Sequence, residues 1–132
     1  MHGFLRWIRP TPRLLLGLAL ALAAQLALAQ APTAVEATFK NMLTALQAGS
    51  VADFVAPGDA NFKSGMNQQM LDSVRASLAP RLTQGYTSTF LGTMNQQGYT
   101  IYLWKLAFKD GMDDRLVTMA MKEGKVAGFF LR

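Results

Sequence analysis

The sequence predicts an α+β fold in which two to three N-terminal helices pack on a bent, cone-like, four-stranded antiparallel sheet. Two observations predict it. Between Pro32 and Leu82, apolar residues recur at spacings of three and four, which is typical of amphipathic helices. From Tyr86 onward, apolar and aromatic blocks alternate with short clusters of Asn, Asp, Lys and Gly, which is typical of an antiparallel meander. Helices followed by strands in a short chain indicate one α+β unit.

Residues 1–29 have the three parts of a secretory signal peptide. Three arginines precede an apolar run, Leu14–Ala29, which ends in small residues. The predicted cleavage site consists of Ala27, Ala29 and Gln30. The run is shorter than the ~20 residues of a membrane-spanning helix. We therefore expect a single domain, 30–132, that is periplasmic or secreted and meets the membrane only transiently; an uncleaved anchor is the alternative.

The composition of the predicted mature chain excludes several kinds of chemistry. The whole sequence has 13 basic and 8 acidic residues, but three of the arginines lie in the predicted signal. The remaining excess of two positive charges gives no basic footprint for nucleic acid. There is no Cys, and the only His is His2. Catalysis by Ser–His or Cys–His, zinc sites built on these residues and thiol redox chemistry are thus excluded, and no cofactor is expected.

The first helix is predicted over Pro32 to Gln47. Thr33 and Glu36 have the spacing of a capping box, in which each side chain accepts a hydrogen bond from the other's backbone. An apolar stripe follows, and Gly49 is a suitable end. A short second helix, VADFV, is expected next, with Ser50 or Asp53 as its cap.

A loop is expected over residues 58–61, and then a longer helix over Asn67 to Leu82. Pro80 cannot donate an N–H group, so a kink or restart is expected there, and Gly85 ends the segment. The strands are then predicted over residues 86–94, 99–108, 115–121 and 125–132. Their turns are expected to centre on residues 96–97, 110–113 and 123–124.

These turns fix a register and therefore two sheet faces. The face predicted to be covered by helices carries Leu91, Tyr102, Trp104, Leu106, Phe108, Val117, Met119, Met121, Val126 and Phe130. The second face would expose Phe90, Leu103, Leu116, Phe129 and Leu131. That is more contiguous apolar surface than a monomer usually shows, so these five residues are the predicted interface of a sheet-to-sheet homodimer. The alternatives are a register slip of one residue, or a helix over part of this face.

Four segments of the chain resemble a known superfamily. They are the first helix with FKNMLTALQAGS, the Gly85–Tyr86 entry to the sheet, YLWKLAFKDG, and the closing GKVAGFFL. Over Pro32 to Arg132 they resemble the nuclear transport factor two-like superfamily, a cystatin-like α+β cone, and in particular its small exported bacterial proteins of unknown function. The resemblance implies a cavity between sheet and helices and, in many members, dimerisation through the sheet. Some members are isomerases, dehydratases or cyclases, and others only bind.

The candidate site residues are few. Tyr102 with Asp53 or Asp59 could form the acid–base pair of a cofactor-free isomerase or hydratase. The structural alternative is that Asp53 caps its helix and Asp59 stabilises a turn. Tyr102, Trp104 and Lys105 are candidates for lining a cavity, although a lysine stem can also pack on the sheet with its ammonium in water. We therefore expect an exported binding or assembly module without catalysis, with the enzyme as alternative, and a small apolar ligand or protein as partner besides a second copy.

No metal site is predicted. Asp110, Asp113 and Asp114 cluster at one turn, but their spacing does not match a calcium loop. Methionines could bind Cu(I), but Met66, Met70, Met119 and Met121 lie where a core needs them.

Overall fold

The computed structural model describes residues 30–132, and the predicted signal peptide with Ala27 and Ala29 lies outside them. The helices are α2 (Thr33–Ala48), α3 (Val51–Val55), α4 (Ala60–Gly65) and α5 (Gln68–Gln84). The strands are β1 (Tyr86–Gln96), β2 (Tyr99–Phe108), β3 (Arg115–Lys122) and β4 (Lys125–Leu131). The strands form one antiparallel sheet in the order β1-β2-β3-β4. The predicted α+β fold is confirmed, with four described helices instead of two to three.

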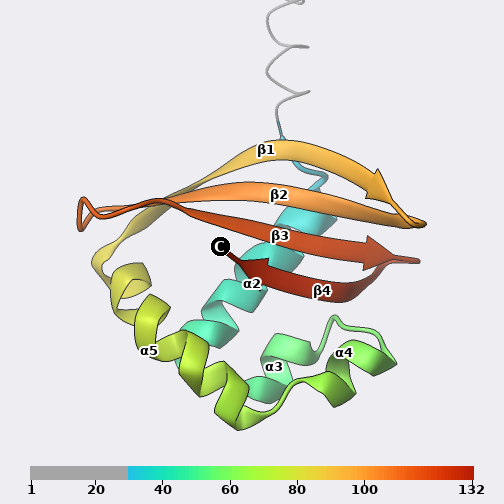
Figure 1. Cartoon of the computed structure of the whole chain (residues 1–132), viewed down its shortest axis with the longest axis horizontal. Coiled ribbons are helices and arrows are strands. Elements are labelled where there is room, and N and C mark those ends of the chain that lie inside the picture. Colours follow the sequence, from blue (N-terminus) through green and yellow to red (C-terminus); the bar gives the residue numbers. More distant parts are fainter. Residues whose placement is uncertain (1–29) are drawn as a thin grey trace, which may run out of the picture. The chain divides into compact units, whose positions relative to one another are not determined.

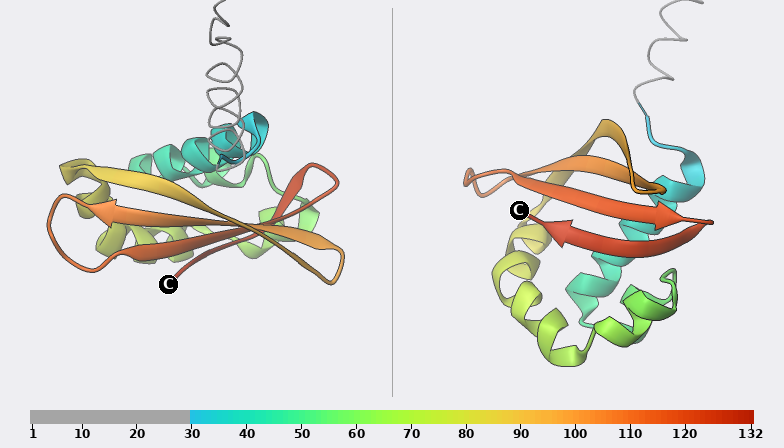
Figure 2. Two further views of the ribbon diagram at one scale, coloured as in Figure 1. Left: turned by 90° about the horizontal axis from the view of Figure 1, so that it is seen from above. Right: turned by 45° about the vertical axis from the view of Figure 1, so that its right-hand side comes forward.

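The helices lie on one side of a twisted sheet (Figures 1 and 2). Helix α2 crosses behind the strands, while α3, α4 and α5 lie below the β4 edge in the view of Figure 1. Strand β4 is an edge of the sheet, as is β1. None of the described helices is long and apolar enough to cross a membrane.

Helix α2 begins differently from the prediction. Pro32 precedes it, and no side chain caps its first turn. The predicted capping box of Thr33 and Glu36 is therefore wrong. The Glu36 carboxylate instead accepts a hydrogen bond of 2.9 Å from the indole Nε1 of Trp104. The end of α2 is as predicted: Gly49 has φ 74°, a left-handed backbone that favours glycine.

The next helices depend on short polar caps. The Ser50 hydroxyl, not the Asp53 carboxylate, caps α3. Helix α4 was not predicted, because Asp59 was assigned to a turn; its carboxylate accepts from the Phe62 N–H at 2.8 Å and starts the helix. Helix α5 starts at the Asn67 cap and passes through Pro80 to Gln84.

Two hairpin turns have left-handed residues at both central positions. The β1–β2 turn is Gln97-Gly98, one residue later than predicted, with φ of 54° and 82°. The β3–β4 turn is Glu123-Gly124, as predicted, with φ of 53° and 77°. Positive φ at both positions is the signature of the type I′ turn, whose twist matches that of paired strands.

Two β-bulges change the predicted faces. One extra residue, Leu91, lies between Phe90 and Gly92 in β1. A second, Ala127, lies between Val126 and Gly128 in β4. An extra residue reverses the alternation of side chains on one side of the bulge.

The bulges contradict part of the predicted face assignment. Phe90, Phe129 and Leu131 lie opposite Trp104, Met119 and Val117, and therefore on the helix-covered face. Their predicted place on the second face is wrong, and the register slip is the reason. Leu91 and Phe130 were predicted in the core but are 55% and 57% exposed. Leu103 and Leu116 lie on the second face as predicted.

The core lies between α2, α5 and the sheet. The predicted core residues Trp104, Leu106, Phe108, Val117, Met119 and Val126 are all buried. The Trp104 ring stacks on Phe39 of α2, with centroids 4.1 Å apart and an interplanar angle of 8°. Stacked aromatic rings add packing energy beyond their buried area, so this pair holds α2 on the sheet.

Candidate functional site

An apolar groove of about 660 Å³ lies between β4 and helices α4 and α5. Its walls are mainly side chains of these three elements and of Met66 in the α4–α5 link: Phe62, Met66, Leu71, Val74, Phe129, Phe130 and Leu131. Phe54 lines it from α3, with its ring 5.4 Å from that of Phe129 and 5.9 Å from that of Phe62. The volume is within the range of small-ligand sites. Its lining, however, includes no charged side chain.

The segment Pro57–Asp59 positions this groove. The Val126 N–H donates to the Pro57 carbonyl, and the Asp59 N–H donates to the Val126 carbonyl, both at 2.9 Å. Gly58 and Val126 thereby form a short parallel bridge. A Cβ on Gly58 would lie 2.5 Å from the Phe62 ring, so only glycine allows α4 to approach this closely. The segment fixes α4 against β4, and the groove opens beyond it.

The groove continues to a smaller hollow at the end of β4. This hollow of about 250 Å³ shares Ser73, Val74 and Leu131 with the groove and adds Arg115. In the part of the chain that the structure describes, Arg115 forms no salt bridge. The apolar groove therefore ends at an unpaired cation.

The sheet face turned away from the helices is a second candidate, here called the outer face. Its apolar residues are Leu91, Met94, Ile101, Leu103, Leu116 and Phe130. Gly128 lies beneath the ring of Phe130, because a Cβ there would be 2.9 Å from a ring carbon. Within residues 30–132, no helix lies over this face (Figure 2).

Charged residues lie at both ends of the sheet. At the β3–β4 hairpin, Lys122 and Lys125 are exposed and lie opposite each other on the outer face. At the other end, the β2–β3 hairpin carries the exposed Asp113 and Asp114. The outer face is thus a largely apolar strip, interrupted by Lys105, with Lys122 and Lys125 at one end and Asp113 and Asp114 at the other.

The structure does not bring the candidate acid–base pair together. Asp53 is exposed, and the Asp59 carboxylate caps α4. Asp59 flanks the open side of β4, whereas Tyr102 is on β2, so about three strand spacings, or ~14 Å, separate their backbones. Tyr102 is half-buried beside Trp104, with ring centroids 6.2 Å apart.

The other two residues predicted to line a cavity, Trp104 and Lys105, do not line one. Trp104 is fully buried and bonded to Glu36, so it offers no surface to a ligand. Lys105 is exposed on the outer face, between Thr89 and Leu116. The predicted grouping of Tyr102, Trp104 and Lys105 in one cavity is therefore wrong, because adjacent strand residues point to opposite faces. The groove residues of α4 and α5 were missed; only the stripe containing Met66, Met70, Leu71 and Val74 signalled them.

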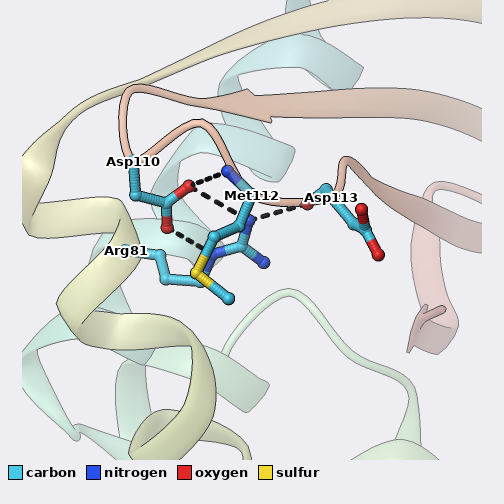
Figure 3. A network of polar contacts seen from close by, with 4 residues as sticks. All are labelled: Arg81, Asp110, Met112 and Asp113. Carbon is cyan, nitrogen blue, oxygen red and sulfur yellow. Dashed lines mark hydrogen bonds and ion pairs between the residues drawn. The ribbon is translucent and has the colours of Figure 1, made fainter.

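Asp110 belongs to a clamp between α5 and the β2–β3 hairpin (Figure 3). Arg81 donates from Nε to the Asp110 carboxylate and from Nη2 to the Asp113 carbonyl, each at 2.7 Å. Its guanidinium also lies 3.9 Å from the centroid of the Phe108 ring. The hydrogen bond from Arg81, and then that from the Met112 N–H, lower the pKa of Asp110. No group of three or more His, Cys, Asp or Glu side chains in residues 30–132 could hold a metal ion.

Comparisons with known proteins give one structural likeness. No family model matches the sequence, and no curated protein matches it. A solved structure, described as an uncharacterised cystatin-fold protein from Novosphingobium aromaticivorans, aligns over 77% of this chain and 99% of its own. The sequence identity is 13% and the TM-score is 0.37. At these values nothing about ligands, partners or activity transfers from that protein.

Proposed function

We propose that this chain is an exported, non-catalytic assembly module of the nuclear transport factor two-like kind that pairs with a second copy through its outer face. The uncovered apolar strip on that face, with Leu103 at its centre, is the observation that carries the proposal. Exposed contiguous apolar surface commonly marks an interaction site. The predicted sheet-to-sheet dimer is kept, but Leu91, Met94, Ile101 and Phe130 replace Phe90, Phe129 and Leu131 in its interface.

The size of the outer face suits a dimer. Four strands about 4.8 Å apart, with the ten residues of β2 rising ~3.3 Å each, give a flat footprint of about 600 Å². The side chains that protrude from the sheet add to this area. A standard stable interface buries about 800 Å² per partner, so the outer face is close to the required scale.

The charged ends select one orientation of the two copies. A two-fold axis between the sheets can run along the strands or across them. An axis along the strands would stack the aspartate pair on its own copy and the lysine pair on its own copy. An axis across the strands places Asp113 and Asp114 of one copy near Lys122 and Lys125 of the other, which is the complementary arrangement. Lys105 lies within the strip, two residues from Leu103 and opposite Leu116, so its long stem has to carry its charge to the rim of the interface.

The oligomeric state tests the proposal. Leu103→Lys places a charge in the centre of the strip and is expected to convert a dimer into a monomer, seen by light scattering as half the mass. Ser77→Lys, on the exposed surface of α5, is the matched control and should leave the mass unchanged. A parent protein that is monomeric at high micromolar concentration would contradict the proposal.

A charge exchange tests the orientation separately. Asp113→Lys with Asp114→Lys should weaken the dimer, because both ends would then be basic. Adding Lys122→Asp and Lys125→Asp to the same chain should restore it, because the two ends are complementary again. Restoration is the decisive result, since an orientation along the strands would not produce it.

The alternative function, a cofactor-free isomerase or hydratase, remains a prediction without support from this geometry. No hydrogen bond joins a carboxylate to Tyr102 among the described residues.

A further inference from the structure

The open edge of β4 presents unpaired backbone groups to the groove. Arg132 and Leu116 exchange two backbone hydrogen bonds of 2.9 Å. In an antiparallel pair, bonded and non-bonded residue pairs alternate, so the next bonded pair is Thr118 with Phe130. The N–H and C=O groups of Phe129 and Leu131 therefore point away from β3. No backbone partner within residues 30–132 pairs with them.

This edge already pairs with one extended segment. Pro57–Asp59 bonds to Val126 in parallel orientation, as the beginning of a fifth strand would. The chain then turns into α4 and leaves the edge uncovered from Phe129 onward. Figure 1 shows β4 as the edge nearest α4. Sheet edges of this kind are normally covered or blocked by charge, because they pair with other strands.

The groove offers both elements that strand addition needs. The backbone groups of Phe129 and Leu131 give hydrogen-bond donors and acceptors along one wall. Phe62, Met66 and Val74 give apolar surface on the opposite wall. Main-chain bonds supply affinity in strand addition, and pockets for alternate side chains supply specificity.

The charge at the end of the groove gives the direction of the added strand. Strand β4 runs from Val126 toward Leu131, and Arg115 borders the hollow next to Leu131. A strand parallel to β4 therefore has its C-terminal end at Arg115. A carboxylate there would pair with the free guanidinium.

We propose that this groove binds an extended apolar peptide segment as a fifth strand, parallel to β4, with its C-terminal carboxylate at Arg115. The site adjoins the proposed dimer interface at Phe130, which lines the groove and also lies on the outer face, but Leu103 at the centre of that interface does not line the groove. A long-chain fatty acid would also suit an apolar groove with one cation. It would leave the backbone groups of Phe129 and Leu131 unpaired, so the free edge favours the peptide.

The first experiment removes one outward donor. The probe is a dansylated Val-Thr-Val-Ile-Val peptide with a free carboxylate, and its binding to the purified protein is followed by fluorescence anisotropy. Leu131→Pro removes an N–H that makes no bond to β3, so the β3–β4 pairing is kept. Leu131→Ala is the matched control, which loses the side chain and keeps the N–H. We expect Leu131→Pro to bind about fivefold or more weakly than Leu131→Ala, as for one lost hydrogen bond. Equal affinities of the two variants, both checked for cooperative unfolding, overturn the proposal.

The second experiment changes the probe. The same peptide methylated on alternate backbone nitrogens should bind more weakly, because it lacks the donors of an added strand. The peptide with a C-terminal amide should bind the parent protein more weakly than the peptide with a free carboxylate. On Arg115→Gln, the two peptides should bind equally well, because the cation is gone. A methylated peptide that binds as well as the unmethylated peptide contradicts strand addition. So does a protein that binds laurate but not the peptide, with a laurate affinity that Leu131→Pro leaves unchanged.

The dimer proposal and the peptide proposal can be contradicted independently. Leu103→Lys should leave peptide affinity unchanged, and Leu131→Pro should leave the dimer mass unchanged. A parent protein that loses its dimer on Leu131→Pro would show that a second copy, not a peptide, occupies the β4 edge.

Discussion

At the scale of single residues, the contact between Trp104 and Glu36 shows how a buried polar atom is satisfied. The indole is fully buried and has one N–H donor. Its partner is a carboxylate on α2, at 2.9 Å. The same carboxylate lies 3.8 Å from the exposed Lys40, a surface pair that contributes little. The hydrogen bond therefore makes Glu36 a structural residue of the core boundary.

Replacement of Glu36 should destabilise the protein through this one bond. Glu36→Ala leaves the indole N–H without a partner, and an unsatisfied buried donor costs about 1–3 kcal/mol. Urea unfolding followed by tryptophan fluorescence measures the loss. Glu36→Gln keeps an acceptor oxygen and should lose much less. Equal losses in the two variants would show that the N–H finds water instead.

The sequence predicted the position of Trp104 but not its partner. The alternation of β2 placed Trp104 on the helix-covered face, and the structure confirms this. Glu36 had the spacing of a helix cap, because local patterns report neighbours a few residues away. Its actual partner is 68 residues along the chain. Contacts at this separation depend on how elements pack, which spacing alone does not reveal.

At the scale of elements, one clamp holds α5 to the β2–β3 hairpin. Arg81 and Asp110 are 14% and 11% exposed at their side chains, and Phe108 lies under the guanidinium. The sequence explained Asp110 by turn chemistry, and the Met112 N–H does donate to its carboxylate at 2.9 Å. The stronger contact comes from the last turns of α5. The clamp therefore attaches the C-terminal part of α5 to the β2–β3 hairpin.

The Asp110 clamp should make stability depend on acidic pH. Its folded pKa is lowered, first by the Arg81 hydrogen bond, so the folded state binds that proton less well than the unfolded state. The contribution is present above the unfolded pKa of about 3.9 and is lost as pH falls through the folded pKa. Asp110→Asn should lower the urea midpoint at pH 7, and this difference from the parent should shrink as pH falls below ~4. Asp114→Asn, an exposed change in the same hairpin, is the control; a pH-independent difference for Asp110→Asn would contradict the clamp.

The elements themselves were largely predictable, and the bulges were not. Apolar spacing gave α2, α5 and all four strands to within a few residues, because regular periodicity reflects burial of one face. Leu91 and Ala127 are ordinary strand residues, and nothing in their identity marks an insertion in the pairing. Only the neighbouring Gly92 and Gly128 hinted at irregular backbone. Since each bulge reverses the faces, these two residues account for the misplaced Phe90, Phe129 and Leu131.

At the scale of the whole described domain, helices cover one face of the sheet and leave two surfaces available. One is the outer face, with its charged ends, and the other is the β4 edge with its apolar groove. The outer face could be predicted from sequence in outline, because too many apolar residues alternate along β2 and β3 for one layer of helices. The groove could not, since it depends on α4, whose cap at Asp59 resembles an ordinary turn.

The charged ends of the outer face should make dimerisation sensitive to salt. In the proposed dimer, the exposed Asp113 and Asp114 of one copy would approach Lys122 and Lys125 of the other across solvent, where the Debye length falls from ~30 Å at 0.01 M to ~8 Å at 0.15 M salt. Sedimentation equilibrium should therefore show a severalfold higher dissociation constant at 0.15 M. Lys122→Gln with Lys125→Gln removes the attraction, so this variant should bind weakly at both concentrations and lose the dependence. The apolar contact of Leu103 is insensitive to salt at these concentrations. A parent dimer with the same dissociation constant at both salt concentrations would therefore be consistent with the apolar interface but would rule out the pairing of opposite charges at its ends.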